Sequence, residues 1–205
     1  MFYSLEKGLF IVDESEISQR KIAVPLAVNW NIAGNCTNSC FYCYGKDIAG
    51  TPLPLYYNKI ADSILSLSPE MVVFSGGEPL LESKFEYAVC TICGKTNLIL
   101  DTNGILIDDE RVKFLKDKRF HVRVSLDSED PVINERNRLS RIDSSTVKIK
   151  NNILKLVEAG VPVTVQTTVT DNNYNYLESL GEYLEKTGVR NWRIAAVIPS
   201  DDVFK

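Results

Sequence analysis

The sequence predicts an α/β fold in which six parallel strands and outer helices form a partial (β/α)6 barrel. Strand-like and helix-like segments alternate along most of the chain, which implies a parallel sheet with helical crossovers. Gly94, Gly160 and Gly188 stand where three of the helices should end. The 205 residues are 44% hydrophobic and 24% charged, a globular composition with enough length for one sizeable core.

The expected elements follow one another from residue 26 to residue 198. The strands are short apolar or alternating runs at 26–32, 71–74, 97–100, 120–126, 161–169 and 192–198. The helices between them are expected at 56–67, 83–93, 108–116, 146–159 and 174–186. Ile149, Ile153 and Val157 show the helical spacing that supports the fourth of these helices.

The boundaries of the domain follow from these elements. Residues 1–24 precede the first core strand and form an N-terminal extension, and residues 25–205 form the core domain. The chain ends soon after its last expected strand, so we expect either a compact enzyme or a chain that lacks a C-terminal segment, and the abrupt end favours the second.

Polar and apolar side chains alternate in the fourth and fifth strands, so each strand has one polar face. The apolar face should pack under the helices, and the polar face should point into the barrel. Arg123 on the polar face of the fourth strand needs a partner there, because an unpaired buried charge is costly. The polar positions of the fifth strand are Thr164, Gln166 and Thr168.

The charge and the cysteine content restrict the class of protein. A net charge of −4 and a pI near 5.2 provide no basic surface for nucleic acid, so we expect no nucleic-acid partner. No apolar run approaches the length of a transmembrane helix, so no membrane association is expected. Five cysteines without a targeting signal fit a reducing compartment and predict a cytoplasmic protein.

Three cysteines lie within eight residues, in the run Cys36-Thr-Asn-Ser-Cys40-Phe-Tyr-Cys43. Cysteine thiolates are the usual ligands of iron–sulfur clusters, and a cubane cluster normally takes four of them. Three close ligands without a fourth at suitable spacing suggest a cluster with one iron open to a small molecule. The alternative for the triplet is a redox-sensing loop or a zinc site. A zinc site usually takes a second distant pair of Cys or His, for which the chain offers Cys90 and Cys93 and one histidine, His121.

The spacing C-x3-C-x2-C, with Tyr42 directly before the third cysteine, resembles the radical S-adenosylmethionine (SAM) enzymes. Three further segments resemble motifs of this family in the family's order. They are Ser75-Gly76-Gly77-Glu78-Pro79, Thr102-Asn103-Gly104 and Ser125-Leu126-Asp127.

The resemblance implies a [4Fe–4S] cluster on Cys36, Cys40 and Cys43, with SAM on the open iron. In that family the reduced cluster splits SAM into methionine and a 5′-deoxyadenosyl radical, which takes a hydrogen atom from a substrate. The three cysteines are therefore the expected catalytic and metal-binding residues.

The other motifs fall at the carboxyl ends of the expected strands, where chemistry gathers in parallel α/β folds. Backbone carbonyls of Gly76 and Gly77, with Glu78, could accept hydrogen bonds from the ammonium group of SAM. Ser125 resembles a residue that family members use toward the ribose or carboxylate of SAM. Asp127 either acts there too or caps the following turn.

The fifth strand and the segment after the fourth strand complete the expected SAM site. Gln166 and Thr168 could meet the carboxylate and ribose hydroxyls of SAM. Of Arg136, Arg138 and Arg141, Arg138 is the expected partner of the carboxylate, through paired hydrogen bonds. The expected cofactor-binding residues are Tyr42, Ser75, Gly76, Gly77, Glu78, Thr102, Asn103, Ser125, Asp127, Arg138, Gln166 and Thr168.

Cys90 and Cys93 fall late in the expected helix 83–93, which would carry them away from the strand ends. They could serve a second cluster or supply the missing fourth ligand, but we expect two ordinary buried helix cysteines at the opposite end of the barrel. His121 begins the fourth strand, also far from the strand ends, and is expected to be structural.

The Thr-Asn-Gly and Ser-Leu-Asp segments resemble the SPASM/twitch-type branch, which implies a peptide or protein substrate. Such an enzyme would need an electron donor of the ferredoxin or flavodoxin type. The alternatives are an activase that installs a glycyl radical in a partner, an enzyme of cofactor biosynthesis, and a non-catalytic sensor that binds SAM or a cluster.

Overall fold

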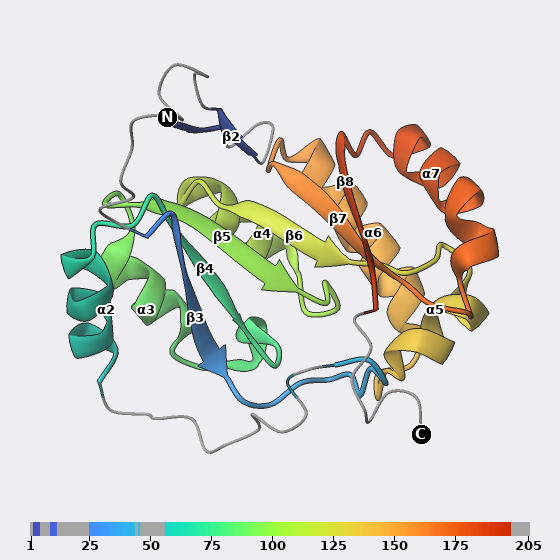
Figure 1. The fold of residues 1–205 in the computed structure, drawn as a ribbon, viewed down its shortest axis with the longest axis horizontal. Coiled ribbons are helices and arrows are strands. Elements are labelled where there is room, and N and C mark those ends of the chain that lie inside the picture. Colours follow the sequence, from blue (N-terminus) through green and yellow to red (C-terminus); the bar gives the residue numbers. More distant parts are fainter. Residues whose placement is uncertain (1, 5–8, 12–24, 44, 46–55, 198–205) are drawn as a thin grey trace.

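The computed structural model describes residues 2–4, 9–11, 25–43, 45 and 56–197 (Figure 1). Its centre is one six-stranded parallel sheet whose strands follow in chain order, β3-β4-β5-β6-β7-β8. The strands are β3 (Ala27–Ala33), β4 (Met71–Gly76), β5 (Asn97–Thr102), β6 (His121–Ser125), β7 (Val163–Val169) and β8 (Asn191–Ala196). Because β3 and β8 remain the two edges, the sheet is unclosed, and the expected partial (β/α)6 barrel is confirmed.

Helices connect the strands and lie behind and beside the sheet in the view of Figure 1. They are α2 (Tyr57–Ser66), α3 (Phe85–Ile92), α4 (Asp109–Asp117), α5 (Pro131–Arg138), α6 (Ser145–Glu158) and α7 (Leu177–Lys186), with short 3-10 turns at Pro79–Leu81 and Tyr174–Tyr176. The five expected helices are present with slightly different ends. The expected strand 192–198 ends at Ala196, and residue 198 lies outside the described residues.

Helix α5 is an element that the sequence analysis missed. It is short, but its start carries two strong local signals. Asp130 is the N-cap, and its carboxylate accepts hydrogen bonds from the backbone N–H of Val132 (2.7 Å) and Ile133 (3.4 Å). Pro131 occupies the first turn, where its missing N–H leaves no hydrogen bond unmade.

The part of the extension that is described, β1 (Phe2–Ser4) and β2 (Leu9–Ile11), pairs as an antiparallel ribbon. No helix in the described ranges is both long enough and apolar enough to span a bilayer.

The main core fills the space between the sheet and the helices. Side chains at alternate strand positions supply it, as in Val122 and Val124, which are fully buried while their neighbour Arg123 is only half-buried. Aromatic rings add to this layer, since the ring of Phe74 lies 5.5 Å from that of Phe85 and 6.0 Å from that of Phe120, measured between centroids.

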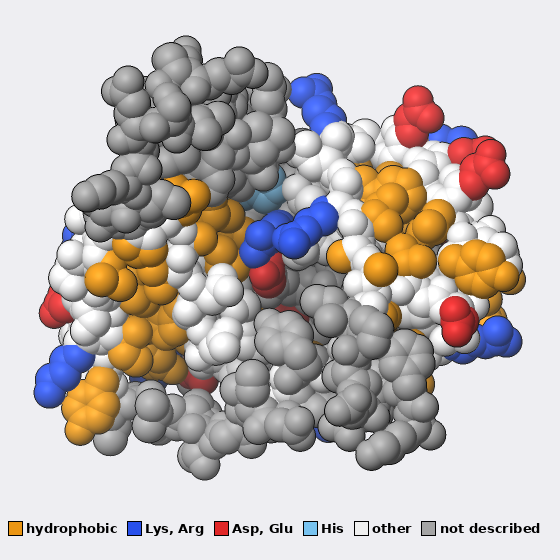
Figure 2. All heavy atoms as spheres, in the orientation of Figure 1, with side chains coloured by type: hydrophobic (Ala, Val, Ile, Leu, Met, Phe, Trp, Pro, Cys, Tyr) orange, Lys and Arg blue, Asp and Glu red, His pale blue; other side chains and the backbone are white. Residues whose placement is uncertain are grey.

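The other face of the sheet is polar over its centre, as the alternation predicts. Arg123 finds the partner that it requires, because its Nε and Nη2 both donate to the carboxylate of Asp101, the latter at 2.7 Å. Gln166 donates to the same carboxylate (3.2 Å), and Arg193 contacts the Gln166 side-chain oxygen at 3.5 Å. Figure 2, which views this face, shows basic and acidic side chains near its centre between hydrophobic areas.

Candidate active site

The expected motifs meet at the carboxyl edge of the sheet. The loop 34–43, which carries the three cysteines and is called here the cluster loop, follows β3. Glu78 follows β4, Thr102 and Asn103 close β5, and Asp127 follows β6. Parallel register brings these ends to one edge, which explains how residues far apart in the sequence become neighbours.

The cluster loop places its cysteines at different depths. Cys36 is half-buried, Cys40 is buried and Cys43 is exposed. Burial raises the pKa of the Cys36 and Cys40 thiols above the usual range. In the described ranges, no three Cys, His, Asp or Glu side chains already converge on a metal position.

The donor set nevertheless fits an iron–sulfur cluster. Three cysteines from one short loop are the ligand type that such a cluster takes. Two N–H donors already reach the first sulfur: the backbone N–H of Asn38 lies 3.4 Å from Cys36 Sγ, and Asn103 Nδ2 lies 3.8 Å from it. Asn103 Nδ2 also donates to Thr37 Oγ1 at 2.8 Å. Such donors orient sulfur ligands and tune the metal that they hold.

Gly76 and Gly77 pack directly against the start of the cluster loop. A Cβ on Gly76 would lie 2.3 Å from the carbonyl oxygen of Ala33, and a Cβ on Gly77 would lie 2.2 Å from that of Asn35. The backbone N–H of Gly77 donates to Ala33 (2.6 Å), and that of Glu78 donates to Asn35 (2.8 Å). The glycines therefore permit close contact between two chain segments. Their approach to SAM stays a prediction.

Glu78 is fully buried, and both of its oxygens accept hydrogen bonds from the protein. Oε1 accepts from Thr102 Oγ1 (2.7 Å) and the backbone N–H of Leu80 (3.1 Å), and Oε2 accepts from the backbone N–H of Asn103 (2.7 Å). Burial raises the pKa of this carboxyl, against the effect of these donors. Glu78 thus ties the end of β4 to the end of β5 and fixes Asn103, which reaches Cys36. Its contact with the ammonium group of SAM stays a prediction.

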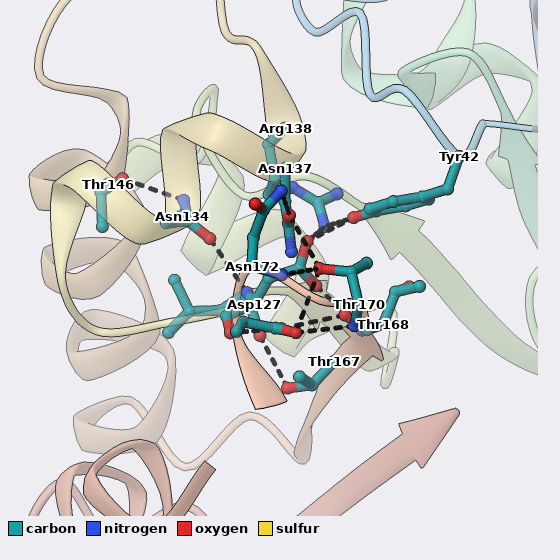
Figure 3. A network of polar contacts seen from close by, with 12 residues as sticks. Tyr42, Asp127, Asn134, Asn137, Arg138, Thr146, Thr167, Thr168, Thr170 and Asn172 are labelled. Carbon is teal, nitrogen blue, oxygen red and sulfur yellow. Dashed lines mark hydrogen bonds and ion pairs between the residues drawn. The ribbon is translucent and has the colours of Figure 1, made fainter. Parts of the chain in front are cut away.

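Asp127 is the centre of the polar network in Figure 3. Its side chain is buried, with Oδ2 accepting from the Tyr42 hydroxyl and from Arg138 Nη1 (3.3 Å). Its Oδ1 accepts from the backbone N–H of Thr168 at 2.9 Å. Asp127 therefore joins the cluster loop, β7 and α5.

Arg138 is the buried member of the three candidate arginines. Its Nη1 donates to the Tyr42 hydroxyl at 2.9 Å as well as to Asp127. Burial raises the pKa of Tyr42, so the phenol stays protonated and can donate to the carboxylate. Arg136 is exposed, and Arg141 reaches Ser39 Oγ at 3.0 Å.

The remaining candidates lie on the polar face of the sheet. Ser125 and Thr168 are half-buried, and Gln166 shares the Asp101 carboxylate with Arg123. Ser75 Oγ donates to Asn31 Oδ1 at 2.7 Å. Their proposed contacts with SAM stay predictions.

The expectation that Cys90 and Cys93 are buried is wrong. Cys90 is exposed and Cys93 is half-buried, because the inward face of α3 is formed by Phe85, Ala88, Val89 and Ile92 instead. Cys93 caps the end of α3, and β5 begins at Asn97, so the pair lies toward the amino edge of the sheet, opposite the cluster loop. His121 is buried, with Nε2 2.7 Å from Thr164 Oγ1.

Three asparagines belong to the site and escaped the sequence analysis. Asn134 Oδ1 accepts from the backbone N–H of Asp127 (2.9 Å), and Asn173 Nδ2 donates to the Asp127 carbonyl (2.9 Å). Asn137 Oδ1 accepts from Thr170 Oγ1 (3.0 Å). The spacing of Asn134, Asn137 and Arg138 is that of one helix face, which is the signal that recognition of α5 would have revealed.

Comparisons with known proteins agree with this arrangement. A family model described as Radical SAM superfamily matches residues 30–184. A probable GTP 3′,8-cyclase of Methanococcus aeolicus is 32% identical over 187 residues, which are 85% of this chain and 60% of that protein. An AdoMet-dependent heme synthase of Oleidesulfovibrio alaskensis is 20% identical over 178 residues, which are 84% of this chain and 46% of that protein.

A solved structure shares the fold. SuiB of Streptococcus suis bound to S-adenosylmethionine superposes with a TM-score of 0.76 and 16% sequence identity, over 87% of this chain and 42% of that one. The chain therefore spans about half of the length of the proteins that it matches.

Proposed function

This chain belongs to the radical SAM superfamily, and we propose that it is the core of an enzyme that starts radical chemistry on a small-molecule cofactor precursor. The observation that carries the proposal is the cluster loop, which presents three cysteines at the strand edge where the SAM motifs meet. Cys36, Cys40 and Cys43 would hold a [4Fe–4S] cluster and leave one iron for SAM. When bound and reduced, this group supplies the electron that cleaves SAM into methionine and a 5′-deoxyadenosyl radical.

The protein's own residues hold and orient these groups. Glu78 and Asn103 fix the end of β5 against Cys36. The backbone after Gly77 and the polar side chains Ser125 and Thr168 line the edge where SAM would lie. We expect electrons to come from a ferredoxin or flavodoxin-type partner, because the reductive cleavage of SAM consumes an electron that the cluster must receive.

Two observations support a small polar substrate. The sequence relatives carry names from cofactor chemistry, GTP cyclisation and heme synthesis. The open face of the sheet is polar, with Asp101, Arg123, Gln166 and Arg193 linked across four strands. The peptide or protein substrate expected from the SPASM/twitch resemblance remains the second candidate.

Anaerobic reconstitution tests the cluster. The protein should bind about four irons per chain, and reduction should give the EPR signal of a [4Fe–4S] cluster. The triple variant Cys36→Ala, Cys40→Ala, Cys43→Ala should bind no cluster. A full cluster in the triple variant would refute the assigned ligands.

Chromatography for 5′-deoxyadenosine tests the chemistry. The reduced protein should form it slowly with SAM alone and faster with the correct substrate, for which GTP, a porphyrin precursor and peptides are compared. Glu78→Ala should weaken SAM binding by about 1.5–3 kcal/mol if the carboxylate accepts the ammonium group. A reconstituted protein that binds SAM without ever cleaving it would favour the sensor alternative.

A further inference from the structure

The cluster loop is paired with the end of α5 through the backbone. The backbone N–H of Ser39 donates to the carbonyl of Leu139 (3.1 Å), and that of Phe41 donates to Asn137 (3.4 Å). In the other direction, the backbone N–H of Arg141 donates to Thr37 (2.9 Å). This short antiparallel contact joins segments about 100 residues apart in the sequence, so it depends on tertiary structure.

Side chains strengthen the same junction. Tyr42 from the loop, Asp127 from the end of β6 and Arg138 from the last turn of α5 contact one another pairwise (Figure 3). Asp127 is 1% exposed and Arg138 is 7% exposed, so their ion pair is shielded from water. Hydrogen bonds that involve an ionised group are strong in such surroundings.

In this three-residue contact, Asp127 is held in place by other parts of the protein. The backbone N–H of Thr168 donates to the Asp127 carboxylate, while Asn134 accepts from the backbone N–H of Asp127 and Asn173 donates to its carbonyl. Both the side chain and the backbone of Asp127 are therefore held. A loop that is bound to Asp127 and Arg138 therefore takes its position from β6, β7 and α5.

The junction also contains buried donors that find no acceptor among the described residues. Arg138 Nε, Asn137 Nδ2 and Asn38 Nδ2 are buried and have no hydrogen-bond partner within the described ranges. All three are N–H donors and all three belong to the two paired segments.

We propose that Tyr42, Asp127 and Arg138 form a clamp that positions the cluster loop, with Arg138 acting as a positioning residue through Tyr42. The part that concerns cluster assembly rests on the proposed function, whereas the ordering of the loop does not. By this proposal the aromatic residue before the third cysteine is required for its hydroxyl as well as for its ring.

Hydrogen exchange on the cluster-free protein tests the clamp first. Arg138→Met and Tyr42→Phe should each speed exchange of the Ser39 and Phe41 amides by about tenfold or more. Arg136→Met is the matched control, since Arg136 is an exposed arginine on the same helix. Arg138→Lys keeps the charge and should give exchange between the wild type and Arg138→Met.

Reconstitution gives the second readout. At equal folded fraction, measured by circular dichroism, Arg138→Met should bind less iron than Arg136→Met and give an altered EPR spectrum. Arg138→Lys should recover part of both properties. A role in general stability alone would lower the folded fraction without changing the spectrum.

The outcomes separate the two hypotheses. Loop exchange and EPR spectra identical to those of Arg136→Met would overturn the clamp. A wild-type protein that assembles no cluster would count against the proposed function, while the exchange data would still decide the clamp. If Arg138→Met does not fold, the exchange rates of Tyr42→Phe decide whether the clamp exists. This variant loses only the hydroxyl oxygen and should therefore fold.

Discussion

At the scale of single residues, Glu78 and Gly77 make close contacts that hold the strand ends against the cluster loop. Glu78 is fully buried and accepts hydrogen bonds from three donors, and Gly77 packs against the backbone of the cluster loop. Gly77 contacts the cluster loop directly at Asn35, and the Glu78 carboxylate supports it through Asn103, which reaches Cys36. Substitutions at either position should therefore disturb the loop before they disturb the rest of the fold.

Glu78→Gln should lower the free energy of unfolding by about 1–3 kcal/mol, because the new amide NH2 would face a buried donor. The folded-state pKa of Glu78 is raised above the unfolded value, so the protonated carboxyl stabilises the fold most at low pH. This contribution is lost as pH rises through the folded pKa. The stability gap between wild type and Glu78→Gln should therefore shrink with rising pH.

Guanidinium unfolding of the cluster-free protein at several pH values, from about pH 5 to about pH 8, measures this gap. A gap that widened with pH would mean that the three donors outweigh burial and hold the pKa of Glu78 below its usual value.

Gly77→Ala should displace the cluster loop, because the added Cβ would lie 2.2 Å from the Asn35 oxygen. Overpacking of this kind costs about 1–3 kcal/mol, and here it should also lower the iron bound after reconstitution. Gly160→Ala is the control, since its Cβ would meet no atom within 4 Å and only its positive φ of 75° is strained. Equal iron content in the two variants, at equal folded fraction, would contradict this role of Gly77.

At the scale of elements, α5 connects the polar network to the cluster loop. Its inward face carries Asn134 and Asn137, and its last turn carries Arg138. Leu139 then takes a left-handed conformation (φ 44°) that ends the helix and turns the chain toward the loop. A helix this short has little stability of its own, so its cap matters.

Asp130→Ala removes that cap and should cost about 1 kcal/mol in urea unfolding. Because α5 would fray, exchange of the Ser39 amide should also accelerate. Asp108→Ala is the matched control: Asp108 caps α4 through the backbone N–H of Arg111 (2.8 Å), and no backbone hydrogen bond joins the described residues of α4 to the cluster loop. If both variants changed loop exchange equally, the link between α5 and the loop would be wrong.

At the scale of the whole molecule, the open parallel sheet separates its two edges. The cluster loop and its partners occupy the carboxyl edge, whereas Cys90 and Cys93 lie on α3 toward the amino edge. The fold therefore separates the five cysteines into two groups. Three of them lie at the edge that carries the site, and the other two lie near the opposite edge.

The double variant Cys90→Ser, Cys93→Ser should keep its full iron content and its rate of SAM cleavage, because neither thiol can reach the cluster loop. Iron analysis and the 5′-deoxyadenosine assay check both expectations. Loss of iron in this variant, with the folded fraction unchanged, would indicate a second metal site that involves this pair.

The sequence by itself determined the architecture and the chemistry of the ligands. The alternation of hydrophobic and polar residues determines which face of each strand is buried. The alternation of strands and helices along the chain indicates a parallel sheet. The spacing of Cys36, Cys40 and Cys43 is local, so it can be read without a fold. Helix α5 was missed because only two of its residues, Asp130 and Pro131, carry a start signal and its face is mostly polar.

Only the tertiary structure decided the partners of the buried polar groups. The sequence showed that Arg123 needs a counter-charge but could not select Asp101, and it could not pair Arg138 with Asp127 and Tyr42. It also could not show that Gly77 meets Asn35 or that Cys90 faces solvent. These contacts join residues from different strands and loops, and their geometry is set by the register and twist of the whole sheet, which no short segment encodes.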